Sequence, residues 1–258
     1  WVVTANAADL RLGRARYAMI CNESGGIIDD TVFYRLGDDE YLLVCNAGNR
    51  QHVVPWIDRW VRELYKGTSV DDRTLATAMI AFQGPATAAA LDLLCDGVAS
   101  KLRPFSSIEG TVASMGALIC RTGYTGEDGF EVSILNDVAE ETWEKLLDHN
   151  VCKPVGLAAR DSLRLEMGYA LYGHEIDATT SPVEAGSTWI ISKKTDTYLG
   201  YNRIQKELNE GVSRQLVAVK LTDKGIAREG AEIRNENDEV IGALTSGGHS
   251  PILSASIG

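Results

Sequence analysis

The sequence predicts an α+β protein in three parts, of which the last is β-rich. Three observations support this fold class. β-rich runs and amphipathic segments follow one another without the regular strand–helix alternation of a doubly wound parallel sheet. After about residue 195 the chain becomes β-rich, as at the start of a small barrel, and there is no internal repeat. We divide the chain into lobes at 1–72, 73–195 and 196–258, the last of them incomplete.

The strands are predicted from short runs rich in β-branched and aromatic residues that are bounded by turn residues. A polar turn at 37–40 joins the first two strands into a hairpin. The predicted strands occupy residues 27–36, 41–46, 74–84, 111–123, 130–135 and 214–222, and a strand–turn–strand pattern occupies residues 231–248.

The helices are predicted from apolar residues that recur every three or four positions. Pro55 and Pro85 stand in the first turns of two of them, where the missing N–H has no helical partner to lose. The predicted helices occupy residues 54–64, 85–102, 137–149, 157–168 and 202–211.

Composition excludes several classes of protein. A net charge of −11 argues against a nucleic-acid partner, because phosphate binding draws on an excess of Lys and Arg. Five scattered cysteines without a CxxC pair indicate neither a zinc site nor a disulfide framework, and they favour a reducing compartment. No apolar run approaches the roughly 18 residues that cross a bilayer. The chain starts at Trp1 and ends within a β-rich segment, so we expect sequence to be missing at both ends, where a targeting segment would not be visible.

A glycine-rich segment, "RTGYTGEDGFEV", raises the question of a phosphate site. A P-loop needs Lys and Ser or Thr after its glycines, whereas Glu127 and Asp128 stand here and would repel phosphate. A dinucleotide fingerprint would lead into a helix, and a strand follows instead. The glycines therefore shape a turn. The chemistry of this segment alone favours a tight hairpin with solvated acids.

Two adjacent acids, Asp29 and Asp30, lie on a predicted strand and point to opposite faces. Asp30 shares its face with Val32 and Tyr34, so one of the two acids faces inward if the other is solvated. Asp30 either lines a ligand cavity or flanks a turn at the surface, and the pattern does not decide between these.

Two arginines lie four residues apart on one predicted helix face, Arg160 and Arg164. Arg160 stands near the helix start, where the dipole disfavours a cation, so a ligand carboxylate or a structural acid is expected to offset its charge. His174 alone indicates a structural residue, and no Ser-His-Asp or Cys-His order supports nucleophilic catalysis. These features could converge on a polar, cation-bearing ligand.

Together these pieces resemble the aminomethyltransferase (T-protein) family of the glycine cleavage system. The resemblance rests on blocks in the family's order and spacing, namely "NESGGIIDDTVFYRL", "YLLVCNAGN", "AFQGP", "RTGYTGEDGFEV", "GLAARDSLRLEMGYALYGHEID" and "TSPVEAGSTW". It runs from about Arg16 almost to the end of the chain.

The resemblance implies a three-lobed, cloverleaf-like fold with antiparallel sheets flanked by helices and a central tetrahydrofolate pocket. It implies transfer of the aminomethyl carbon from lipoylated H-protein to tetrahydrofolate, which is a co-substrate, with release of ammonia and without a metal. The partners would be H-protein and folate, with no nucleic acid and no membrane. The compartment would be the bacterial cytoplasm or the mitochondrial matrix.

The resemblance also assigns roles to residues. Asp30 matches the family's key carboxylate, which is expected to meet the pterin side of the folate and activate its attacking nitrogen. Glu131 is suited to accept hydrogen bonds from the pterin, and Arg160 to meet the glutamyl carboxylate or the acids of the pocket. The further folate-contact positions are Tyr17, Val32, Tyr34, Asn46, Tyr124, Tyr169 and Trp189.

The sequence departs from the family pattern at Ala158, where a glycine is common, and in lacking parts at both ends, which leaves the activity of this chain by itself open. Three other functions stay open beside the transferase. One is a folate-dependent demethylase with a small amine or sulfonium donor. Another is a folate-binding assembly factor for iron–sulfur proteins, which is expected to carry a "KGCYxGQE"-type motif where "RTGYTGEDGF" stands. The third is an adaptor with a degenerate pocket.

Overall fold

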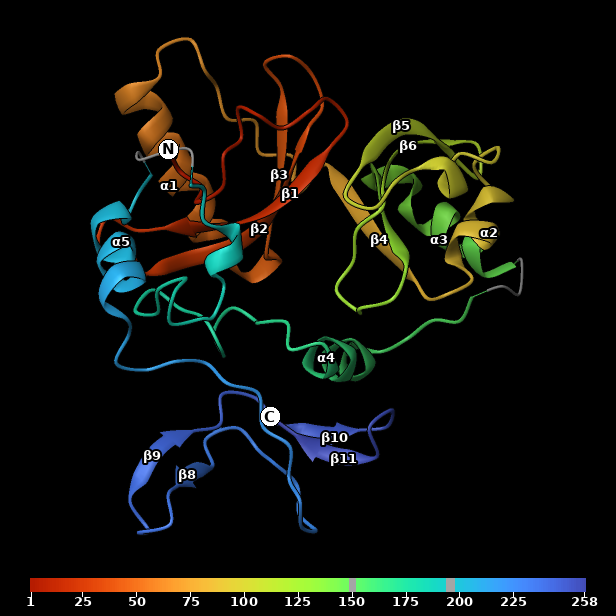
Figure 1. The fold of residues 1–258 in the computed structure, drawn as a ribbon. Coiled ribbons are helices and arrows are strands. Elements are labelled where there is room, and N and C mark those ends of the chain that lie inside the picture. Colours follow the sequence, from red (N-terminus) through yellow and green to blue (C-terminus); the bar gives the residue numbers. More distant parts are fainter. Residues whose placement is uncertain (149–151, 194–197) are drawn as a thin grey trace.

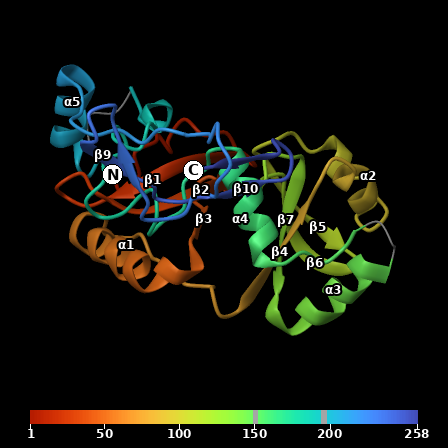
Figure 2. The ribbon, with the colours of Figure 1, turned by 90° about the horizontal axis from the view of Figure 1, so that it is seen from below.

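The computed structural model describes residues 1–148, 152–193 and 198–258, and it confirms the α+β class. Three bodies are visible in Figure 1: a sheet with helices α1 and α5, a second sheet with α2 and α3, and a C-terminal part made of two short ladders. Helix α4 lies below the two larger bodies in Figure 1 and between them in the view of Figure 2. The lobe borders at 72 and 195 remain predictions.

The first sheet is antiparallel, in the order β1 (Ala15–Cys21), β2 (Ile27–Arg35), β3 (Tyr41–Cys45), which confirms the predicted hairpin. Phe33 of β2 packs with Ala18, Ile20 and Val53 in a core beneath helix α1 (Arg50–Leu64). Tyr34 on the opposite face packs against Cys120 of the second sheet. The two faces of β2 are therefore both covered, one by a helix and one by the neighbouring lobe.

Helix α1 corrects one prediction, because it begins at Arg50 rather than near Pro55. A 3₁₀ turn, η1 (Ala47–Asn49), leads directly into it. Pro55 therefore lies inside the helix, where it cannot donate to the carbonyl of Gln51. Val53 of the same helix is buried against the sheet, and the sequence signal of the proline misplaced the helix start.

The second sheet is antiparallel in the order β4 (Thr77–Gln83), β7 (Gly129–Leu135), β6 (Met115–Cys120), β5 (Ser107–Val112). Helices α2 (Thr87–Asp92) and α3 (Ala139–Asp148) close its core, with the 3₁₀ turn η3 (Asn136–Val138) leading into α3. The core of this body comprises Ile80, Phe82, Ala90, Leu91, Ile119, Phe130, Val132, Ile134 and Leu146 among others. His149, the last residue predicted for α3, lies outside the described residues.

Two predictions for this body were wrong in their extent. The helix predicted over 85–102 stops at Asp92, because the chain turns through left-handed conformations at Asp96 and Gly97 before the 3₁₀ turn η2 (Ala99–Lys101). The single strand predicted over 111–123 is a hairpin, in which Ala113 and Ser114 take φ values of 52° and 72°. Ala113 is no turn residue by type and Ser114 is a weak one, so the pattern hid both the turn and strand β5.

After α4 (Leu157–Glu166) the chain returns to the first sheet. Ile176 and Val183 of this return segment, residues 170–193, pack with Met19 and Ile27 of the sheet and with Ile204 of helix α5 (Tyr201–Glu210). The return segment also contains the 3₁₀ turn η4 (Thr188–Ile190). None of the described helices is long and apolar enough to span a bilayer.

The C-terminal part holds two antiparallel ladders, β8 (Glu232–Arg234) with β9 (Val240–Ala243) and β10 (Gly248–Ser250) with β11 (Ala255–Ile257). The ladder of β8 and β9 confirms the strand–turn–strand pattern predicted over 231–248, whereas the described residues form no closed barrel. The strand predicted over 214–222 forms only an isolated bridge, from Lys220 to Ile257. The backbone N–H groups of Val219 and Leu221 donate to the carbonyls of Gly258 and Ser256, so the pairing with this end of the chain is confined to residues 219–221 and does not extend over the predicted strand.

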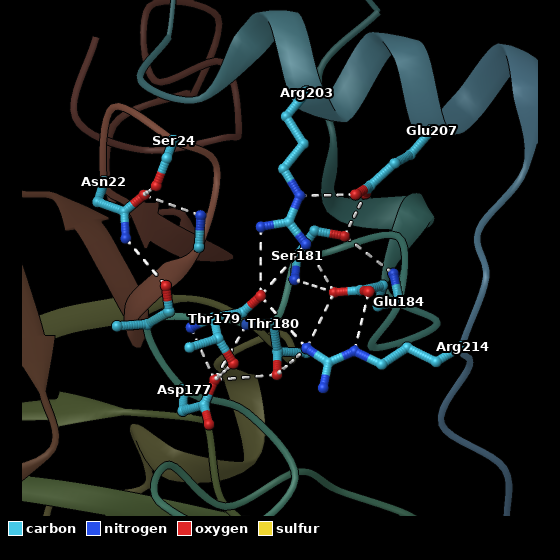
Figure 3. Close-up of polar contacts among 12 residues, drawn as sticks. Asn22, Ser24, Asp177, Thr179, Thr180, Ser181, Glu184, Arg203, Glu207 and Arg214 are labelled. Carbon is cyan, nitrogen blue, oxygen red and sulfur yellow. Dashed lines mark hydrogen bonds and ion pairs between the residues drawn. The ribbon is translucent and has the colours of Figure 1, made fainter. Parts of the chain in front are cut away.

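A buried carboxylate joins the return segment to α5 and to the start of the C-terminal part (Figure 3). Glu184 accepts hydrogen bonds from Arg203 of α5 at 2.8 Å and from Arg214 at 2.9 Å, and from the backbone N–H of Ser181 at 2.9 Å. Both guanidinium groups also donate to the carbonyl of Thr179. Burial opposes ionisation of Glu184, but Arg214, the Ser181 N–H and Arg203 outweigh it and hold its pKa below the ordinary value. The junction therefore depends on the charged form.

We expect Glu184→Gln to lower the free energy of unfolding at pH 7 by about 3 kcal/mol, because it removes the carboxylate that pairs with Arg214 and leaves Arg203 with Glu207 alone. A depressed pKa contributes stability above about pH 4.5, the ordinary value, and this stability is lost as the pH falls through the pKa of the folded state. The difference in the free energy of unfolding between the variant and the unsubstituted protein should therefore become smaller at acid pH. Urea unfolding at several pH values measures it. Glu210→Gln, on the exposed face of α5, is the control and should change the free energy by less than about 0.5 kcal/mol.

Candidate functional site

Asp30 lies on β2 and is held by hydrogen bonds to both of its oxygens. The Tyr17 hydroxyl on β1 donates to Oδ2 at 2.9 Å, and the Asn46 side-chain amide, just after β3, donates to Oδ1 at 2.7 Å. The side chain is half-buried, on the face of the sheet that it shares with Val32. Three strands thus fix one carboxylate in place, and Tyr17 and Asn46, two of the predicted folate-contact positions, both contact Asp30.

Asp29, which sequence reasoning did not assign to the site, is fully buried directly beside Asp30. It accepts hydrogen bonds from the backbone N–H of Asn46 at 2.9 Å and from its side-chain amide at 2.8 Å. The same amide therefore bridges both acids, and neither acid is fully solvated. Strand alternation contained the signal, since Asp29 shares its face with Thr31 and Phe33, and Phe33 is a core residue.

The surroundings of Asp30 perturb its proton equilibrium and that of its neighbour. Burial raises the pKa of the Asp30 carboxyl, and the hydrogen bonds from Tyr17 and Asn46 partly oppose this shift. Burial, followed by the charge of Asp30, raises the pKa of the Tyr17 phenol. Tyr17 is therefore a neutral hydrogen-bond donor, and Asp30 is a carboxylate more basic than one in water.

Two aromatic pairs lie near this carboxylate. Tyr17 stacks on Trp189 of η4, with ring centroids 5.7 Å apart, and Trp189 is 72% exposed. Tyr124 stacks on Tyr169 at 5.8 Å, and its hydroxyl donates to the carbonyl of Ala170. Burial raises the pKa of the Tyr124 phenol and the Asp30 charge acts in the same direction, which places Tyr124 within electrostatic reach of the acid. Flat surfaces of this kind suit a planar ring.

The glycine-rich turn is built around one side chain, that of Gln83 on β4. Its amide donates to the carbonyls of Thr122 and Phe130 at 3.1 and 3.0 Å. A Cβ at Gly123 or at Gly129 would come within 1.9 or 2.3 Å of the Gln83 oxygen, so a larger residue at either position would have to displace the Gln83 side chain. Asp128, which the sequence placed among the turn and surface acids, closes the turn through a bidentate pair with Arg121 (2.8 and 2.6 Å).

Glu131 follows this turn on β7. The hydroxyl of Thr122 lies between Glu131 and Tyr34 of the first sheet and contacts both. Thr122 donates to Glu131 Oε2 at 2.6 Å, and its oxygen lies 2.8 Å from the Tyr34 hydroxyl. Tyr34 is 0% exposed, so its side chain offers no surface to a ligand in this structure. Thr122, which is also buried, was missed by sequence reasoning, because a threonine in a turn carries no functional signal by itself.

The two arginines of α4 differ sharply in their surroundings. Arg160 is exposed, its guanidinium carbon lies 4.7 Å from the centroid of the Tyr124 ring, and none of the described carboxylates is within ion-pair distance of it. Arg164 is 2% exposed and pairs with Asp161 at 2.8 Å and with Glu175 at 2.7 Å. The structural ion pair that was an alternative for Arg160 is thus found at Arg164. None of the described acids neutralises the charge of Arg160.

The remaining candidates lie elsewhere. His174 faces Glu229, with 3.5 Å between Nδ1 and Oε2. Within the described ranges, no group of three or more His, Cys, Asp or Glu side chains is arranged to hold a metal ion.

Comparison with known proteins places this arrangement in a family. The family model described as the GCVT N-terminal domain matches residues 1–195, and the glycine cleavage T-protein C-terminal barrel domain matches residues 214–258. The chain belongs to the glycine cleavage T-protein family.

Individual relatives agree with this assignment. The chain is 40% identical to an aminomethyltransferase of Halothermothrix orenii and 39% identical to one of a Thermotoga species, and the matches cover all of this chain and 72% and 70% of theirs. The crystal structure of glycine cleavage system aminomethyltransferase T from Bartonella henselae superimposes with a TM-score of 0.89 at 33% identity, covering 100% of this chain and 70% of that one. The family and the fold class expected from the sequence are both confirmed.

Because the pKa of Asp30 is raised in the folded protein, ionisation of Asp30 costs the folded state stability as the pH rises above about 3.8, the ordinary value. We therefore expect the free energy of unfolding of Asp30→Asn, relative to the unsubstituted protein, to increase with pH from about pH 4 and then level off. Denaturant unfolding across the pH range measures this difference. Asp38→Asn, at a side chain that is 99% exposed, should show a flat difference. A difference that falls with pH would contradict the placement of Asp30.

Proposed function

We propose that this protein transfers the aminomethyl carbon carried on the lipoyl arm of H-protein to tetrahydrofolate. The products are 5,10-methylenetetrahydrofolate, ammonia and dihydrolipoyl H-protein. Family membership and the aminomethyltransferase relatives support the reaction. The relatives named above are bacterial, which supports the bacterial cytoplasm as its compartment.

The residues present fit a reduced folate in three respects. Its pterin and aminobenzoyl rings are planar and suit the stacked pairs of Tyr17 with Trp189 and of Tyr124 with Tyr169. Its pterin N–H groups suit the carboxylate of Glu131, whose Oε1 receives no hydrogen bond from any described residue. Its glutamyl carboxylate suits the guanidinium of Arg160, which pairs with none of the described acids. The bound folate would supply the nucleophilic nitrogen that receives the carbon.

The observation that carries the proposal is the geometry at Asp30. Both oxygens have one fixed donor each, Tyr17 and Asn46, and the carboxylate stays half-buried with a raised pKa. Such a group orients an approaching N–H and stabilises positive charge that develops on an amine. Because its position is set by strand pairing and two hydrogen bonds, little reorganisation is needed when the charge develops.

Arg160 is proposed to meet the glutamyl carboxylate. Its charge is not neutralised by any described acid, and the Tyr124 ring under the guanidinium restrains the side chain. Val32 supplies apolar surface beside Asp30 on the same strand face. We propose these contacts from the positions of the side chains on the two sheets and α4.

The deciding assay combines the protein with tetrahydrofolate and aminomethylated H-protein, and follows ammonia and 5,10-methylenetetrahydrofolate against a reaction without protein. Equal amounts of both products are expected. Folate binding with neither product would overturn the donor and favour demethylation of a small amine or sulfonium compound, or a folate-binding assembly role without transfer.

We expect Asp30→Asn to lower the turnover number by about 10²-fold or more, because an amide cannot stabilise the developing positive charge as a carboxylate does. The dissociation constant for tetrahydrofolate should change much less, since the amide keeps the shape and one acceptor. Steady-state kinetics and equilibrium dialysis separate the two quantities. If both changed by the same factor, Asp30 would serve affinity alone.

Arg160→Gln should weaken tetrahydrofolate binding by about 5-fold, the range expected for an ion pair that remains in contact with water. The affinity of the unsubstituted protein should fall with added salt, and that of the variant should fall less. Arg62→Gln, at an exposed arginine of α1 that pairs with Asp58, is the matched control and should leave both quantities unchanged. An unaltered dissociation constant in Arg160→Gln would remove its role.

A further inference from the structure

We propose that Thr122 is a positioning residue for Glu131, and that with Tyr34 it holds this carboxylate at a defined place relative to Asp30. The inference rests on the proposed folate site and assigns a specific part of it. Thr122 is buried and contacts Tyr34 of the first sheet from the second. It would act on a bound folate only through Glu131.

The direction of the hydrogen bonds follows from the groups involved. An ionised carboxylate only accepts hydrogen bonds, so the Thr122 hydroxyl donates its one proton to Glu131 Oε2, at 2.6 Å. The Tyr34 hydroxyl, 2.8 Å away, must then donate to the Thr122 oxygen. The three groups form a directed chain from the first sheet to the second.

Each end of this chain is anchored. Tyr34 is fully buried and belongs to the same strand face as Asp30, four residues along β2. The carbonyl of Thr122 accepts from Gln83, the side chain around which the glycine-rich turn is built. This relay of Tyr34, Thr122 and Glu131 therefore connects Glu131 to the strand that carries Asp30. One oxygen of Glu131 is held, and the other receives no hydrogen bond from the described residues.

Holding the carboxylate has a physical consequence. A free glutamate side chain samples several rotamers and loses that freedom when it binds a ligand, which weakens the affinity. Thr122 removes this loss in advance. A hydroxyl at this place thus strengthens folate binding although it does not touch the folate.

The test uses shape-matched variants and measures the tetrahydrofolate dissociation constant by equilibrium dialysis. Thr122→Val removes the hydroxyl and keeps the volume, and we expect about 5- to 10-fold weaker binding, as for a charge-assisted hydrogen bond and a side chain released on its loss. Thr122→Ser keeps the hydroxyl and should restore binding to within about 2-fold. Thr111→Val, at an exposed threonine of β5, is the control and should bind as the unsubstituted protein does.

A double-mutant cycle separates positioning from general stability. In the Glu131→Ala background the acceptor that Thr122 holds is gone, so Thr122→Val should add less than about 2-fold to the loss. Equal losses in both backgrounds would show that Thr122 acts on the fold and not through Glu131, and would overturn the inference. Unfolding curves for each variant show whether the protein remains folded under the binding conditions.

The outcomes also separate this inference from the proposed function. If the unsubstituted protein binds tetrahydrofolate and Thr122→Val binds it equally well, the relay is wrong and the folate site stands. If the unsubstituted protein does not bind tetrahydrofolate at all, the folate site and the relay both fail. The dissociation constant is measured without aminomethyl transfer. The result therefore stays valid even if H-protein is not the donor.

Discussion

The buried guanidinium of Arg164 is the interaction on which the arrangement of the parts depends. It is 2% exposed and bonds to Glu175 of the return segment at 2.7 Å and to Ser246 of the C-terminal part at 2.8 Å. Glu175 in turn accepts from the Leu171 N–H and from Thr245, both at 2.9 Å. A charge withdrawn from water this far is tolerable only when it is fully paired. The pair therefore holds α4, the return segment and the C-terminal part in one arrangement.

This arrangement determines where the aromatic surfaces of the site lie. Arg164 also donates to the carbonyl of Tyr169 at 3.3 Å, and Tyr169 stacks on Tyr124. Arg160, one helical turn before Arg164, lies over the same Tyr124 ring. The stability of a buried ion pair and the placement of a binding surface are thus properties of the same short helix.

The two acids of the proposed reaction come from different sheets, and their relation depends on how those sheets meet. Asp30 is fixed within the first sheet by Tyr17 and Asn46. Glu131 is fixed within the second by Thr122. The small apolar cluster of Ala15, Tyr34 and Cys120 joins the two sheets, so the packing between the sheets sets the distance between the two acids.

Local chemistry in the sequence determined much of this protein. The hairpin of β2 and β3, the helix α4 and the turn character of the glycine-rich segment follow from strand alternation, helical spacing and the freedom of glycine, which act over a few residues. Family likeness added Asp30, Tyr17 and Asn46 as a group, and these three are in contact. Only the tertiary structure decided that Asp29 is buried under the same amide, that Arg164 and not Arg160 carries the structural ion pair, and that Thr122 joins Tyr34 to Glu131. These depend on contacts between residues up to 88 positions apart, and the free energy of such contacts depends on burial and partners, which no local pattern contains.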